Sequence, residues 1–77
     1  MKVWISRDKP VSGAVEVYLT NKPVLNKNGY FSPDYNAGAD GDDIMNTWSL
    51  RDFKHSFGFT PRKGTCKQYE LTLKEIK

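Results

Sequence analysis

The fold is decided by one stretch near the N-terminus, KVWISRDKPVSGAVEVYLT, which covers residues 2–20. Its opening part alternates, so that Val3 and Ile5 share one side of an extended segment and Trp4 points to the other. β-Branched and aromatic residues fill this segment, which favours a strand. Residues 8–13 then collect turn-forming residues, among them a proline that cannot donate a backbone hydrogen bond. We therefore expect a first strand that ends in a polar turn.

The second half of the stretch repeats the alternation over residues 14–20. Val15, Val17 and Leu19 fall on one face of this segment, whereas Tyr18 falls on the other. Two alternating segments joined by a short polar loop predict an antiparallel hairpin.

Turn-forming residues dominate the next part of the chain. Residues 26–29, NKNG, end in a dipeptide that supplies the positive φ angles of a tight hairpin loop, and we expect a short third strand near residues 30–32. Residues 33–43 contain four aspartates and almost no apolar periodicity. We expect a flexible acidic loop there, and a loop of this length in a small domain often carries function.

The following residues predict a strand over 44–48 and then one short helix. Ser49 is a typical N-cap residue. Three apolar residues follow it at the spacing of a helical face: Leu50, Phe53 and Phe57. The glycine after them can end the helix in the left-handed conformation.

The C-terminal residues predict a closing strand over 66–76, with Tyr69, Leu71 and Leu73 on one side. The alternation fails at its end, where we expect a bulge or fraying. Together these elements predict an α+β fold, a small antiparallel sheet of three to five strands with one short helix packed on one face. The 77 residues are expected to form a single domain, residues 1–77.

Chemically reactive residues are few. The chain has one cysteine and one histidine, Cys66 and His55, and nothing in the sequence requires them to be in contact. Asp40, Asp42 and Asp43 flank a glycine, but the ligand spacing of a calcium loop is absent. No glycine-rich phosphate loop, nucleophile elbow or zinc-protease motif occurs. We therefore expect no enzyme activity, no cofactor, no metal site and no small-molecule substrate.

The net charge of +3 is unevenly distributed. Residues 1–48 carry five Lys and Arg against six Asp and Glu, whereas residues 49–77 carry seven against three. A basic half can attract nucleic acid. Five basic residues are the candidates for such contacts: Arg51, Lys54, Arg62, Lys63 and Lys67. Trp4, Tyr18 and Tyr69 are candidate stacking groups. One alternative is therefore a small nucleic-acid-binding accessory protein that uses its basic C-terminal half.

The aromatic content of 13% exceeds what one short helix can cover. Trp4 and Tyr18 fall on the side of the sheet opposite the helix, with Arg7 nearby, and exposed Trp, Tyr and Arg are typical of interface hot spots. The leading hypothesis is therefore a non-catalytic protein–protein interaction or regulatory module. Its partner would be another protein or a second copy of the chain in a homodimer.

The N-terminal third resembles small uncharacterised proteins of bacteria and their phages. Those proteins begin K-x-W-I-x-R-D, as residues 2–8 do here, continue into a second strand and reach a K-P turn like that of Lys22 and Pro23. No activity is assigned to that family, so the resemblance carries over no functional residues. It implies a bacterial or phage origin.

The sequence also bears on the cellular compartment. It contains no apolar run of about 18 residues, and the N-terminus lacks the apolar region of a signal peptide. Its single thiol cannot form an intrachain disulfide. We therefore expect a cytoplasmic protein without a membrane segment.

Overall fold

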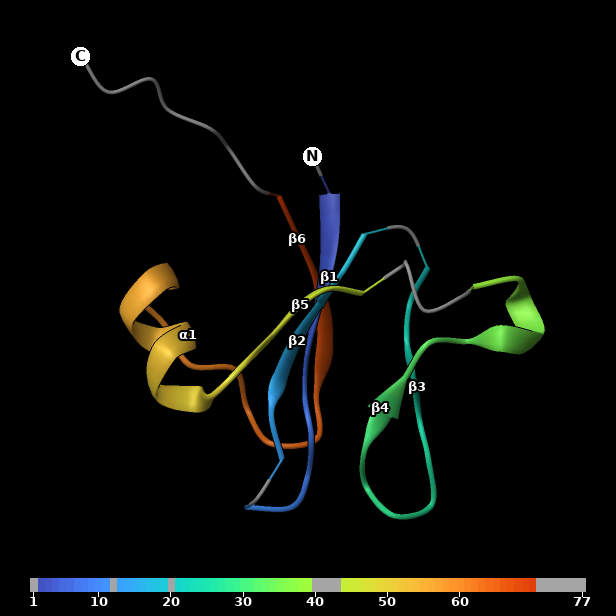
Figure 1. Ribbon diagram of the computed structural model, residues 1–77, viewed down its shortest axis with the longest axis horizontal. Helices are drawn as coiled ribbons and strands as arrows, with labels where there is room; N and C mark the ends of the chain where they lie inside the picture. Colours follow the sequence, from blue (N-terminus) through green and yellow to red (C-terminus); the bar gives the residue numbers. More distant parts are fainter. Residues whose placement is uncertain (1, 12, 20, 40–43, 71–77) are drawn as a thin grey trace.

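The computed structural model describes residues 2–11, 13–19, 21–39 and 44–70. It shows an α+β architecture with a four-stranded sheet, a separate two-stranded sheet and one α-helix (Figure 1). In chain order the elements are β1 (Lys2–Arg7), β2 (Val15–Tyr18), β3 (Val24–Leu25), β4 (Phe31–Ser32), the 3-10 helix η1 (Tyr35–Ala37), β5 (Ile44–Trp48), α1 (Leu50–Phe57) and β6 (Cys66–Glu70). The predicted fold class is confirmed.

The larger sheet is antiparallel and has the order β5-β2-β1-β6. β1 pairs with β2 through Trp4↔Tyr18 and Ile5↔Val17, as the sequence predicts for the hairpin. β1 also pairs with β6, with Val3 opposite Tyr69 and Ile5 opposite Lys67. The strand from the C-terminal part of the chain therefore lies against the first strand and forms one edge of the sheet.

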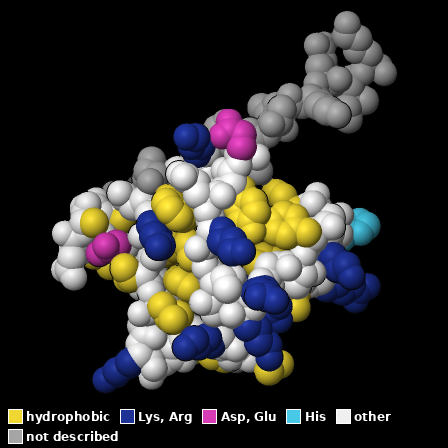
Figure 2. Space-filling view, turned by 180° about the vertical axis from the view of Figure 1, so that it is seen from behind, with side chains coloured by type: hydrophobic (Ala, Val, Ile, Leu, Met, Phe, Trp, Pro, Cys, Tyr) yellow, Lys and Arg dark blue, Asp and Glu magenta, His cyan; other side chains and the backbone are white. Residues whose placement is uncertain are grey.

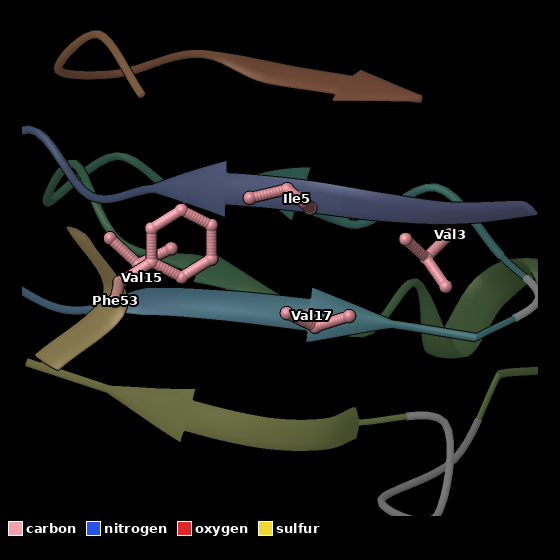
Figure 3. Packing of buried hydrophobic residues seen from close by; sticks show 5 residues of the cluster. All are labelled: Val3, Ile5, Val15, Val17 and Phe53. Carbon is pink, nitrogen blue, oxygen red and sulfur yellow. The ribbon is translucent and has the colours of Figure 1, made fainter. Parts of the chain in front are cut away.

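The core lies on one side of this sheet, which we call the helix face because it carries Val3, Ile5, Val15 and Val17. These four side chains are at most 2% exposed, and they pack against the fully buried Phe53 of α1. Figure 3 shows the five side chains gathered along the β1–β2 pair. Their burial supplies the apolar stabilisation that a chain of this size needs.

The helix forms where the sequence predicts it. The side chain of Ser49 accepts a hydrogen bond from the backbone N–H of Asp52 at 3.1 Å, which caps the first turn. Gly58 adopts φ of 81° and ends the helix in the left-handed conformation. Phe53 and Phe57 stack with their ring centroids 4.4 Å apart, so the predicted apolar stripe does face the sheet.

The opposite side of the sheet is also covered, which the sequence interpretation missed. We call it the hairpin face; it carries Trp4, Ser6, Glu16 and Tyr18. Figure 1 shows α1 on one side of the larger sheet and the β3–β4 hairpin on the other. The fold is thus a sheet between two layers, although only the helix was expected to pack on it.

A buried carboxylate fastens the β3–β4 hairpin to the larger sheet. Asp8, 5% exposed, follows β1, and its Oδ1 accepts a hydrogen bond from the Phe31 N–H at 2.8 Å. Its Oδ2 accepts one from the Ala14 N–H at 3.1 Å, so one side chain ties the β1–β2 loop to β4. The Lys9 N–H also donates to the Gly29 carbonyl at 2.8 Å.

Two segments differ from their predicted extent. β2 ends at Tyr18, where the register with β5 shifts, and Leu19 is 36% exposed instead of packing in the core. The region expected to be a loop contains η1, whose N-cap Asp34 accepts a hydrogen bond from the Ala37 N–H. Residues 40–43 and 71–77 lie outside the described residues, so the acidic Asp40–Asp43 turn and the second half of the predicted closing strand are not described.

Within the described part of the chain, no helix is long and apolar enough to span a membrane.

Candidate functional site

The predicted patch of Trp4, Tyr18 and Arg7 does not exist as an exposed unit. Tyr18 is fully buried on the hairpin face. Arg7 alternates onto the helix face with Val3 and Ile5, away from Trp4. Trp4 is only partly exposed. The prediction that Tyr18 belongs to an exposed interface patch is therefore wrong, because the β3–β4 hairpin covers the face on which it lies.

Tyr18 belongs to a polar cluster on the hairpin face. Its hydroxyl donates a hydrogen bond to Glu16 Oε1 at 3.0 Å, and the Thr47 hydroxyl lies 3.4 Å from Glu16 Oε2. Burial raises the pKa of Glu16 above its usual value, an effect that the hydrogen bond from Tyr18 opposes and the charge of Asp8 reinforces. Burial and the Glu16 charge both raise the pKa of Tyr18. Glu16 itself is half-buried.

Trp4 interacts with a basic side chain. Lys22 Nζ lies over its ring, 5.6 Å from the centroid, in the geometry of a cation–π contact. The same ammonium group acts on Cys66 at the start of β6, where burial raises the thiol pKa to about 11 and the Lys22 charge opposes that rise. Trp4 pairs with Gln68 of β6, so Lys22 lies on the hairpin face above the strand next to β6.

A second group of basic residues lies at the end of β1 and in the loop before β6. Arg7 donates from Nη1 to the Pro61 carbonyl at 2.8 Å, and its backbone bonds to both Gly64 and Thr65. The loop that contains Arg62 and Lys63 is thereby fixed against the end of β1. Both side chains are exposed.

Lys9 joins this group by packing on a glycine. A Cβ atom at Gly64 would lie 2.8 Å from Lys9 Cγ, so the aliphatic part of Lys9 rests against the Gly64 backbone. Only a residue without a side chain leaves room for it there. We define the basic surface by six Lys and Arg residues in and around β6: Arg7, Lys9, Lys22, Arg62, Lys63 and Lys67.

The basic surface can be followed in Figure 2. β5 passes in front of the sheet in Figure 1, so the reverse view in Figure 2 looks at the β6 edge. Lys and Arg side chains spread across the middle and lower part of this face, whereas the acidic side chains in view lie toward its upper and left margins. Asp8 is buried and Glu16 half-buried, and Glu70, the exposed acid of β6, lies at the strand end away from Arg62 and Lys63.

Among the predicted basic residues, Arg62, Lys63 and Lys67 lie in β6 or in the loop before it, whereas Arg51 and Lys54 lie exposed on α1. Three members of the surface were not predicted: Arg7 as a basic neighbour of β6, Lys9 and Lys22. They lie in the near-neutral half of the sequence, and only the β1–β6 pairing, which no local pattern specifies, brings them to the basic half.

Aromatic rings border the basic surface. A continuous layer crosses the helix face from β5 to β6, formed by Trp48, Phe53, Phe57, Phe59 and Tyr69. Its last two rings, Phe59 and Tyr69, have centroids 5.3 Å apart and remain partly exposed. Tyr69 shares the helix face of β6 with Lys67, two residues away.

The remaining reactive residues, His55 and Cys66, lie on different elements. His55 is exposed on α1, and Cys66 is a half-buried free thiol at the start of β6. Its raised pKa keeps it protonated at neutral pH, which fits a structural residue and not a nucleophile. Among the described residues, no group of three or more His, Cys, Asp and Glu is placed to hold a metal ion.

Comparison with known proteins adds no relative: no family model, no curated protein and no solved structure matches this chain.

Proposed function

We propose that this protein is a non-catalytic accessory protein that binds nucleic acid through the basic surface around β6. One observation carries the proposal: six Lys and Arg residues from four separate segments lie in or around β6, at one edge of the sheet and on both of its faces. Like charges repel, so their gathering costs stability unless a polyanion neutralises them. Phosphate contacts from such side chains supply most of the affinity of non-specific nucleic-acid binding.

The salt dependence of binding tests this proposal. Fluorescence anisotropy with labelled DNA and RNA probes would measure the affinity from about 50 to 200 mM salt. We expect Lys67→Glu to bind about 10-fold more weakly at low salt, and the log–log salt slope to fall by about one for the phosphate contact removed. The matched control is Lys27→Glu, an exposed lysine in the turn between β3 and β4. Equal effects of the two changes, or no binding at all, would refute the proposal.

The variant Lys54→Glu tests whether the basic residues of α1 take part in binding. Lys54 is a sequence candidate that lies on α1, outside the basic surface. We expect its reversal to weaken binding less than that of Lys67. A larger effect of Lys54 would move the interface to the helix.

The second candidate is a protein partner, which the open edge of the sheet favours. β6 pairs with β1 alone among the described strands, so its outer side can accept an added strand. The basic surface around this edge would select an acidic extended segment. In a homodimer two such edges would repel each other, and rising salt would then strengthen self-association. Sedimentation at low and high salt measures this directly.

The proposed place of action is the cytoplasm of a bacterium, for a protein of bacterial or phage origin. The resemblance of the N-terminal strands and the unpaired Cys66 thiol support this part of the proposal.

A further inference from the structure

The aromatic pair at the border of the basic surface points to the kind of nucleic acid. Phe59 and Tyr69 are partly exposed, and Tyr69 lies on the same face of the same strand as Lys67. Figure 2 shows a hydrophobic patch directly beside the Lys and Arg side chains on this side of the molecule. Aromatic rings next to cationic groups are the combination that binds unpaired bases and their phosphates.

The core and the sheet hold Phe59 and Tyr69 in place. Phe59 meets the fully buried Phe53 edge-on, with centroids 5.3 Å apart, and the Tyr69 backbone is paired to β1 opposite Val3. The two rings are tilted by 37° to each other. Because the core fixes them before binding, a base that stacks on them has little side-chain ordering to offset.

The elements of the basic surface are a poor fit to a duplex. They are an edge strand, the end of β1, two loops and the segment after β2, and none of the six residues lies on α1. A helix is the element that most often enters the major groove of DNA. The base faces of a duplex are also already stacked, so the exposed rings would have nothing to contact.

We propose that the ligand of the basic surface is a single-stranded nucleic acid, with one or more of its bases stacked on the Phe59–Tyr69 pair. This inference rests on the proposed function and adds the substrate class to it. Lys67 and its basic neighbours contact the phosphates, while Tyr69 contributes a π-face that accepts any base. We therefore expect weak sequence preference.

Fluorescence anisotropy with three probes tests the inference: labelled single-stranded DNA and RNA of about 15 nucleotides, and the matching DNA duplex. We expect both single strands to bind more tightly than the duplex. Tyr69→Leu should weaken single-strand binding about 10-fold and change duplex binding by no more than about twofold. Tyr69→Phe keeps the ring and should bind like the unaltered protein. Tyr35→Leu, at a 64% exposed tyrosine in η1, is the control for loss of a surface ring.

A crosslinking experiment needs no variant and covers the case in which Tyr69→Leu fails to fold. A strand with halogenated uracil is irradiated in complex with the unaltered protein, and the attached residue is identified by mass spectrometry. Attachment to Phe59 or Tyr69 supports the inference.

The outcomes also separate this inference from the proposed function. Equal affinity for strand and duplex, or attachment elsewhere, overturns the stacking proposal while nucleic-acid binding stands. Absence of binding to all three probes overturns both, as does tighter binding of an acidic peptide than of any strand.

Discussion

The helix face and the hairpin face of the same sheet are both buried, but they are covered by different interactions. On the helix face, Val3, Ile5 and Phe53 pack as apolar side chains, and Trp48 Nε1 is buried there without a hydrogen-bond partner among the described residues. On the hairpin face, the Tyr18 hydroxyl donates a hydrogen bond to Glu16, and the Asp8 carboxylate accepts hydrogen bonds from backbone amides. Buried apolar surface therefore holds α1 on the sheet, whereas a few hydrogen bonds hold the β3–β4 hairpin.

The difference has a cause in the elements themselves. α1 presents a continuous aromatic stripe, whereas β3 and β4 have two residues each and little apolar surface to offer. A covering element this small needs hydrogen bonds at fixed positions, and the Asp8 carboxylate provides two of them. Variants on the two faces should therefore fail in different ways.

The largest effect is expected on the helix face. Phe53→Ala should reduce the free energy of unfolding by about 4 kcal/mol, because it removes a fully buried ring and leaves a cavity under the aromatic layer. Urea unfolding followed by circular dichroism measures the loss. Val11→Ala, at a side chain that is 89% exposed, is the control and should change stability by less than about 0.5 kcal/mol. A small effect of Phe53→Ala would show that the helix face is not the main core.

On the hairpin face, Asp8→Ala should cost about 2 kcal/mol, because it leaves the Ala14 and Phe31 amides without their acceptor. The variant should first destabilise the β3–β4 hairpin and leave the larger sheet intact. Amide hydrogen exchange should accelerate at Phe31 and Gly29 well before it does in β1 and β2. Uniform acceleration in both layers would contradict the view that directional contacts hold the hairpin.

The contrast between the faces also explains what the sequence could predict. The two-residue period of Val3, Ile5, Val15 and Val17 and the cap at Ser49 are local patterns, and the structure confirms the strands and helix that they predicted. The cover of the second face depends on Asp8 reaching Phe31, 23 residues away, and no periodicity encodes such a contact. Tyr18 was therefore predicted to be exposed when it is buried.

The candidate site shows the same limit. Arg62, Lys63 and Lys67 are close in sequence and could be proposed together, but Lys9 and Lys22 reach β6 only through tertiary pairing. The small side chain of Gly64 is the one local hint, and it acquires meaning only when Lys9 is seen to lie on it. Topology assembled this surface from segments that carry no common motif.

A smaller effect sharpens the comparison within the polar cluster. Tyr18→Phe keeps the buried ring and removes only the hydroxyl that donates to Glu16, so we expect a cost of about 1 kcal/mol. Thermal unfolding measures it, with Tyr35→Phe at an exposed position as control. A cost as large as that of Phe53→Ala would contradict the view that the two faces are stabilised by different interactions.

The smallest effect is one of pH, and it concerns Glu16. Its folded-state pKa is raised above the unfolded value, so the fold favours the protonated carboxyl. The stability that this preference contributes is fully present below the unfolded pKa of about 4.5 and is lost as pH rises through the folded pKa. Glu16→Gln removes the titratable group. The stability of this variant relative to the unaltered protein should be highest near neutral pH, and this advantage should decline as the solution is acidified toward pH 4.5. Because Gln keeps an acceptor for Tyr18, the difference between the two profiles isolates the carboxylate charge. Parallel profiles would show that the hairpin layer leaves Glu16 as well solvated as an exposed glutamate, contrary to the covered hairpin face described here.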